Sequence, residues 1–203
     1  MRVVPRWVLF TSGCAPVLLI GGWTGAALFE GPAYDHVSQT ISVLGAYGAP
    51  GFWVMSAAFL ALGACHLLTA WGLRAAATAG RIALAGGGLA ALGVVVLPAP
   101  SSGGSLRHGA VAVVGFTLLA VWPVLAANGG PAAPWALRLM PSITVTALMA
   151  VGGAWFLIEM HRQGDVGIAE RVVTGVQSLW PLVVAASCLR HAGNRVRRAP
   201  GRP

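Results

Sequence analysis

The sequence predicts an all-α protein: a polytopic bundle of six transmembrane helices with both termini in the cytoplasm. Of its 203 residues, 57% are hydrophobic and only 9% are charged, whereas a soluble domain is about 25% charged. Several apolar runs reach the length of about 20 residues with which a helix crosses the core of a bilayer. The arginines gather on alternate connections between these runs, which orients the bundle.

Hydropathy places the six spans at roughly 7–28, 51–71, 81–97, 109–127, 139–158 and 172–189. The first span follows two arginines, as a signal peptide would, but its apolar run exceeds the about 7–15 residues of such a segment. The third contains "AGGGLAALG", and small residues of this kind let membrane helices approach closely. Arg107 and His108 precede the fourth span, and Glu170 and Arg171 precede the sixth.

The basic residues are all arginines, and their distribution predicts the orientation. Ten of them lie on the side of the termini: Arg2, Arg6, Arg74, Arg81, Arg138, Arg190, Arg195, Arg197, Arg198 and Arg202. Only Arg107, Arg162 and Arg171 lie on the other side. Because short loops rich in basic residues stay in the cytoplasm, both termini are expected there. We expect a bacterial plasma membrane protein with a bundle over residues 1–189 and a basic tail over 190–203.

Composition also excludes some classes of function. The net charge of +8 would suggest nucleic acid in a soluble protein, but no basic surface interleaved with exposed aromatics is present here. The tail is better explained by contact with anionic lipid headgroups than by protein docking. The three cysteines lie inside apolar runs, where small hydrophobic packing is their usual role. No Cys or His spacing indicates a metal site, and no cofactor is expected.

One polar stretch, "YDHVSQTISVLG" at residues 34–45, interrupts the apolar sequence between the first two spans. The five acids all lie on this expected outer side, in the first and third outer connections or at adjacent helix ends. In a small bundle the three outer connections must be neighbours. The residues expected to converge there are Asp35, His36, Ser42, His108, Glu159, His161 and Glu170. Each could instead anchor a helix end or bind loop backbone.

Helical spacing extends this polar cluster into the membrane. Glu170, Thr174 and Gln177 are spaced i, i+4, i+7 and share one helix face, and polar groups at such depth usually face the bundle interior. We expect Glu170 in the first turn of its helix, where the dipole favours the charged form. Trp155 lies one turn below Glu159. Interior tryptophans such as Trp180 fill core space or line a pocket and stabilise a cation.

Three segments carry a resemblance to a known family: "HVSQTISVLGAYGAP", "RHGAVAVVGF" and "GIAERVVTGVQSLW". Together they resemble the domain-of-unknown-function 998 family, a group of six-helix bacterial membrane proteins, over nearly the whole chain. The resemblance implies signature positions at Ser42, Leu44, Gly45, Pro50, His108, Glu170 and Arg171. Such proteins often carry an acid in the second outer connection, where this chain has "LPAPSSGG". The family name implies a fold but no activity.

The favoured function is an intramembrane enzyme that acts on a lipid-like or isoprenoid substrate by acid/base chemistry. By analogy with small membrane-bound terpene cyclases, a carboxylic acid would protonate an alkene or epoxide, and a buried site would keep that acid neutral. The candidate catalytic residues are Asp35, Glu159, Glu170 and His108. The candidate substrate-binding residues are His36, Ser42, Trp155, Thr174, Gln177 and Trp180. The expected partners are the bilayer and an apolar or prenylated small molecule.

Two alternatives remain open at this point. Ser42 or Ser38 could act as a nucleophile with a histidine, although the chain has no GxSxG elbow. A non-enzymatic transporter, lipid-binding protein or membrane-assembly protein is also compatible with the polar stripe, although no inverted repeat indicates a transporter. His66, in the inner half of the second span, is interpreted as a hydrogen-bonding residue between helices. The oligomeric state is open.

Overall fold

The described part of the protein is built from helices. The computed structural model describes residues 4–130 and 133–198, and no strand occurs among them. The elements in chain order are α1 (Trp7–Ala27), α2 (Ile41–Leu44), α3 (Phe52–Gly72), α4 (Thr78–Val96), α5 (Leu106–Ala126), the 3-10 helix η1 (Trp135–Leu137), α6 (Leu139–Arg162) and α7 (Val166–Arg198). Within these residues, six helices are long and apolar enough to cross a membrane, which confirms the predicted spans.

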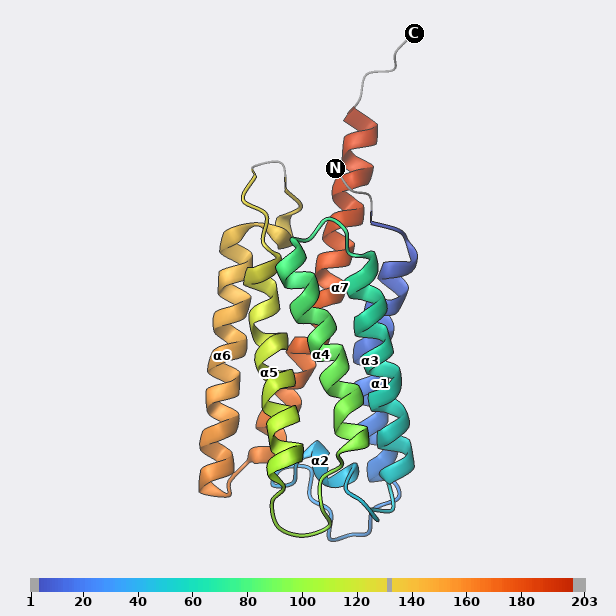
Figure 1. Cartoon of the computed structure of the whole chain (residues 1–203), viewed down its shortest axis with the longest axis vertical. Coiled ribbons are helices and arrows are strands. Elements are labelled where there is room, and N and C mark those ends of the chain that lie inside the picture. The colour runs from blue at the N-terminus through green and yellow to red at the C-terminus, as the bar shows by residue number, and fades with distance from the viewer. Residues whose placement is uncertain (1–3, 131–132, 199–203) are drawn as a thin grey trace.

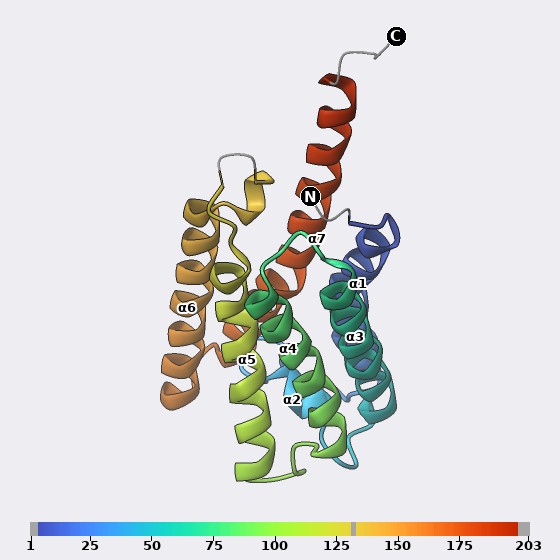
Figure 2. The same cartoon turned by 45° about the horizontal axis from the view of Figure 1, so that its top comes forward.

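The six long helices stand side by side in an up-and-down bundle (Figure 1). α1 packs against α3 and α7, α4 packs against α3 and α5, and α6 packs against α5 and α7. The start of α1 and the end of α7 lie at the same end of the bundle, called here the terminal end. The opposite end, called here the loop end, carries the connections 28–51, 97–105 and 163–165. The short helix α2 lies at the loop end and contacts α1 and α7 (Figures 1 and 2).

Small residues bring α3 and α4 into very close contact. A Cβ atom added to Gly63 would lie 2.7 Å from the carbonyl oxygen of Gly88. A Cβ atom added to Gly88 would lie 2.9 Å from the carbonyl oxygen of Gly63. Since lipid removes most of the hydrophobic drive between helices, such van der Waals packing is a main source of their association. The expectation of close packing at "AGGGLAALG" is therefore confirmed for this helix pair.

The last helix differs from its prediction at both ends. It begins at Val166 instead of 172 and continues to Arg198 instead of ending at 189. Hydropathy detects only the apolar part of a helix, whereas the intrahelical backbone hydrogen bonds can continue through polar residues beyond that part. The predicted tail over 190–203 is therefore a helical extension as far as Arg198, and residues 199–203 lie outside the described part. The short helix α2 was not predicted at all, because four residues carry no usable periodicity.

Candidate functional site

A cavity of about 90 Å³ lies inside the bundle, between α1 to α5 and α7. Most of its wall is apolar and includes the rings of Phe59 and Phe116. The polar side chains that line it are Ser42, His66, His108, Glu170, Thr174, Gln177 and Ser178. An apolar cavity with a few polar groups in fixed positions is the usual form of a small-molecule site. This cavity is therefore the candidate functional site.

Glu170 provides the one carboxyl group in the cavity lining, and it is only 5% exposed. Its Oε2 accepts a hydrogen bond from the backbone N–H of Ile41, the first residue of α2. The side chain of Ser42 interacts with the same carboxyl group. The Ile41 donor matters because a carboxylate without partners is strongly disfavoured in an apolar interior. The contact joins two segments that are 129 residues apart.

The position of Glu170 within its helix corrects one expectation. Because α7 begins at Val166, Glu170 lies in the second turn, and the first turn contains no acid. The influence of the helix dipole falls off within the first turn. The environment of the Glu170 carboxyl group is therefore set mainly by its burial and by α2, not by the start of its own helix.

Ser42 and His108 form a hydrogen-bonded pair next to Glu170. The Nε2 atom of His108 lies 3.2 Å from the hydroxyl of Ser42, and its Nδ1 atom lies 2.9 Å from the carbonyl oxygen of Leu97. A carbonyl oxygen only accepts, so Nδ1 carries the proton in this contact. In the neutral imidazole, Nε2 is then the acceptor, and the Ser42 hydroxyl donates to it. This arrangement orients His108 as a base toward Ser42.

The predicted polar stripe on α7 faces the same cavity. Thr174 donates its hydroxyl to the carbonyl oxygen of Glu170 at 2.8 Å, one turn earlier. Gln177 is buried, and its Nε2 donates to the carbonyl oxygen of Phe116 on α5 at 3.0 Å. The stripe therefore continues inward from Glu170, as the i, i+4, i+7 spacing predicted. The substrate-binding roles of Thr174 and Gln177 remain predictions.

His66 is a cavity residue whose importance the sequence analysis missed. It is 1% exposed and lines the cavity from α3. Neither of its ring nitrogens has a hydrogen-bond partner within the described part of the chain, so the interpretation of His66 as a hydrogen-bonding residue between helices is wrong. Buried polar groups in native structures nearly always have partners. A buried histidine within an apolar span was the available signal, because such residues in membrane helices often mark functional sites.

Arg171, the neighbour of Glu170, fastens the first loop-end connection to α7. Its Nη1 donates to the carbonyl oxygens of His36 at 3.0 Å and Gln39 at 2.9 Å, and its Nη2 donates to the phenol oxygen of Tyr34. The guanidinium carbon also lies 5.9 Å from the ring centroid of Trp23 on α1. Burial raises the pKa of Tyr34, although the guanidinium opposes this rise. Arg171 thereby holds the segment that leads into α2 and Ser42.

Asp35 and His36 lie in this connection and do not line the cavity. Asp35 is exposed, and its carboxylate accepts the Ser38 hydroxyl at 2.6 Å and the backbone N–H of Val37 at 3.0 Å. These hydrogen bonds, the one from Ser38 first, hold the pKa of Asp35 below its usual value. His36 is exposed, and its ring meets the Tyr34 ring edge-on, with 5.0 Å between centroids. Both residues shape the loop, and their predicted site roles have no support from the cavity geometry.

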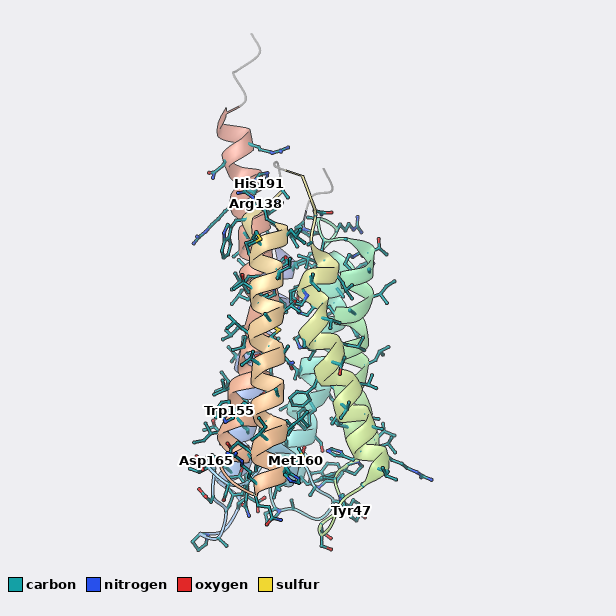
Figure 3. All side chains as sticks on the ribbon, turned by 90° about the vertical axis from the view of Figure 1, so that its left-hand side faces the viewer. Tyr47, Arg138, Trp155, Met160, Asp165 and His191 are labelled. Atoms are coloured by element: carbon teal, nitrogen blue, oxygen red, sulfur yellow. The ribbon has the colours of Figure 1, made fainter. Side chains whose placement is uncertain are left out.

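Glu159, Trp155 and Trp180 also lie outside the cavity lining. Glu159, on α6, accepts the backbone N–H of Asp165 at 3.0 Å, so its carboxylate holds the turn between α6 and α7. Trp155 is half-buried on α6, toward the end of the bundle that carries Asp165 and Met160 (Figure 3). Trp180 packs against Trp135, with 6.3 Å between ring centroids, in the core cluster nearer the terminal end. The structure thus brings Ser42, His108, Glu170, Thr174 and Gln177 together and leaves the other predicted residues elsewhere.

The described residues contain no group of three or more His, Cys, Asp or Glu side chains that could hold a metal ion.

The comparisons with known proteins identify a family for this chain. The model of a family described as "Protein of unknown function (DUF998)" matches residues 13–187. The chain matches no curated protein and no solved structure.

Proposed function

Because the chain belongs to the DUF998 family of multi-pass membrane proteins, whose description assigns no activity, we propose its function from the cavity. We propose an enzyme that acts on a lipid-like or isoprenoid substrate by acid/base chemistry. One observation carries this proposal: Ser42, His108 and Glu170, from three separate segments, meet at the polar side of an apolar cavity. A hydroxyl, a base and an acid within reach of one another in one pocket are the groups that a candidate active site requires.

The cavity lining supports an amphiphilic substrate. Apolar side chains and the rings of Phe59 and Phe116 make up most of the wall, which suits a hydrocarbon chain. The carboxyl, imidazole and hydroxyl groups suit a polar group at one end of that chain. Such a substrate would enter from the bilayer, in which it already dissolves. We place the protein in a bacterial plasma membrane with the loop end outward, as the arginines predict.

The chemistry that we favour is proton transfer by Glu170. A protonated Glu170 would donate its proton to an alkene carbon or an epoxide oxygen, and the resulting cation would close a ring by accepting electrons from a second double bond. Loss of a proton from the final cation would complete an isomerisation and return the proton to the site. Aromatic faces such as Phe59 and Phe116 stabilise cations by about 0.5–2 kcal/mol each. Among the candidate acids, only Glu170 lines the cavity.

A second chemistry is favoured by the Ser42–His108 pair. With Nδ1 of His108 donating to Leu97, Nε2 is positioned to accept the Ser42 proton. A serine paired with such a base is the usual arrangement for nucleophilic catalysis. Ser42 would attack an acyl or phosphoryl group, and the leaving group would take the proton from His108. Ser38 is a weaker candidate because its hydroxyl donates to Asp35.

Mass spectrometry of cell extracts tests the proposal. Cells would express the wild type, Glu170→Gln, Ser42→Ala or the control Asp165→Asn, with prenylated precursors supplied and each protein confirmed in the membrane. Asp165 is an exposed acid at the same end and lies outside the cavity. We expect a new species in the wild type and the control that falls about 100-fold or more in Glu170→Gln, the usual effect of losing a general acid.

The form of the product separates the two chemistries. A species isomeric with its precursor indicates cyclisation by Glu170. A hydrolysed or transferred product that disappears in Ser42→Ala indicates the nucleophilic route. Identical profiles for all four proteins, together with retention of a precursor by the purified wild type, would contradict an enzyme. That outcome would support the non-enzymatic alternative, a lipid-binding or transport protein.

A further inference from the structure

A second hollow lies at the terminal end of the bundle, away from the candidate functional site. It has a volume of about 570 Å³ and lies between η1, the start of α6 and the last turns of α7. Figure 3 shows two of its residues, Arg138 and His191, at the end opposite Asp165. We call this hollow the basic groove, because both Arg138 and Arg190 line it.

One face of α7 changes from apolar to polar along the groove. Val183, Ser187, Arg190 and Asn194 are spaced i, i+4, i+7, i+11 and all line it, so they share a single helix face. The apolar run of α7 ends at Leu189, directly before Arg190. With about 20 helical residues in the hydrocarbon core, α7 is expected to leave the core near this point. The apolar floor of the groove therefore lies at the depth of acyl chains, and its polar part lies at the depth of headgroups.

The charge of the groove is positive and has no acid to balance it. The five acids of the chain, Glu30, Asp35, Glu159, Asp165 and Glu170, belong to the loop end or to adjacent helix turns. Arg138 donates its Nε–H to the carbonyl oxygen of Ala133 at 3.2 Å, which fixes the direction of the guanidinium. Within the described residues, the buried Nε2 atom of His191 has no hydrogen-bond partner.

We propose that the basic groove binds the headgroup of an anionic phospholipid. The lipid phosphate would lie between Arg138 and Arg190, since guanidinium groups bind phosphate oxygens through paired N–H donors. The ring of His191 would turn its buried, unpartnered Nε2 toward another headgroup oxygen, and an acyl chain would lie on Leu182 and Val183. Trp135, 55% exposed, would sit at the membrane–water interface, where tryptophan is enriched.

Two features favour a lipid over a free phosphate compound. The floor of the groove is apolar and is continuous with a helix face that spans the membrane, which a small soluble anion would not use. Basic pockets between transmembrane helices are also known to hold anionic headgroups. The inference does not depend on the enzymatic proposal, because the groove shares no lining residue with the cavity that contains Glu170.

Native mass spectrometry with added lipid tests the basic groove. The full-length protein would be titrated with phosphatidylglycerol, cardiolipin or phosphatidylcholine in the same detergent. We expect retention of the two anionic lipids, and a loss of affinity of about 30-fold in Arg138→Gln/Arg190→Gln, since each basic residue near a membrane contributes about a fivefold effect. Phosphatidylcholine binding should be weak and unchanged.

The control is Arg6→Gln/Arg74→Gln, which removes the same charge from exposed positions at the same end but outside the groove. Equal loss in both double variants, or no loss in the groove variant, would overturn the proposal. Displacement of bound lipid by glycerol 3-phosphate alone would show that the groove recognises a soluble phosphate instead. If the glutamine variant does not fold, Arg138→Lys/Arg190→Lys retains the charge and should show a smaller loss.

Discussion

Glu170 and Arg171 are adjacent on α7, yet their side chains serve different parts of the loop end. The Glu170 carboxyl group faces the cavity and binds the start of α2. The Arg171 guanidinium turns toward the first connection and binds the carbonyl oxygens of His36 and Gln39. Consecutive helical residues point about 100° apart, so one pair can hold both the site and the loop that covers it. Both residues therefore help to position Ser42. Glu170 binds the start of α2, and Arg171 holds the connection that leads into α2.

At this scale, the turn formed by Asp35 should weaken in acid. Its hydrogen bonds hold its pKa below the usual value of 3.8, so its contribution to stability is present above that value. The contribution is lost as the pH falls through the lower pKa of the folded state. We expect the backbone amides of Val37 and Ser38 to lose hydrogen-exchange protection between pH 6 and pH 2, after correction for intrinsic rates.

The matched variant for this measurement is Asp35→Asn, which cannot titrate. Its protection of these amides should not change between the two pH values, and it should be lower than in the wild type at pH 6 because the Asn side chain has one acceptor oxygen instead of two. Protection in the wild type that does not change with pH, or the same change in Asp35→Asn, would show that Asp35 does not hold this turn.

At the scale of elements, the contact between α3 and α4 sets the distance between two of the helices that line the cavity. Gly63 and Gly88 allow the two backbones to meet, and His66 lies one turn beyond Gly63 on the same helix. Leu62 and Gly87, next to these two glycines, line the cavity. A separation of α3 from α4 would therefore enlarge the cavity as well as loosen the bundle.

Gly63→Ala should destabilise the protein by about 1–3 kcal/mol, the usual cost of overpacking a tight contact. The added Cβ would meet a backbone oxygen, which cannot rotate away as a side chain can. Thermal unfolding in detergent measures the effect. The control is Gly153→Ala on α6, where an added Cβ meets nothing within 4 Å, and which should be neutral or more stable. Equal effects of the two variants would contradict the proposed contact.

At the scale of the whole molecule, charge is divided between the two ends of the bundle. The acids gather near the loop end, and Arg74, Arg81 and Arg138 lie at the terminal end. Membrane insertion retains arginine-rich connections in the cytoplasm, with little contribution from acids. This division therefore predicts the orientation of the bundle, in which the loop end, with Ser42 and Glu170, would face the outer side of the membrane.

Reporter fusions test the orientation. A reporter that works only in the cytoplasm should be active when fused after Arg198 and inactive when inserted at Gly164. Substituting Arg74, Arg81 and Arg138 together should increase the fraction of inverted molecules, because the terminal end would lose most of its short-loop positive charge. Activity at Gly164 in the unchanged chain would reverse the proposed orientation.

The fold was largely accessible from the sequence, but the candidate site was accessible only in part. The stripe of Glu170, Thr174 and Gln177 was predicted correctly because helical periodicity decides which residues share a face. Asp35 and Glu159 were grouped with Glu170 because all three are acids at one end of the bundle. The structure instead uses the first two to bind backbone N–H groups in tight turns. Composition alone does not distinguish an acid that faces a cavity from an acid that caps a turn.

Apolar length was enough to establish six spans, and the placement of the arginines predicts an orientation that stays a prediction. Both depend on properties that add up along the chain. The meeting of Ser42, His108 and Glu170 depended on α2, on the bond from His108 to Leu97 and on the hold of Arg171. Apart from the bond between His108 and Leu97, these are contacts between residues far apart in sequence. Only tertiary structure decides them, because the direction of each side chain is set by the helices that pack around it.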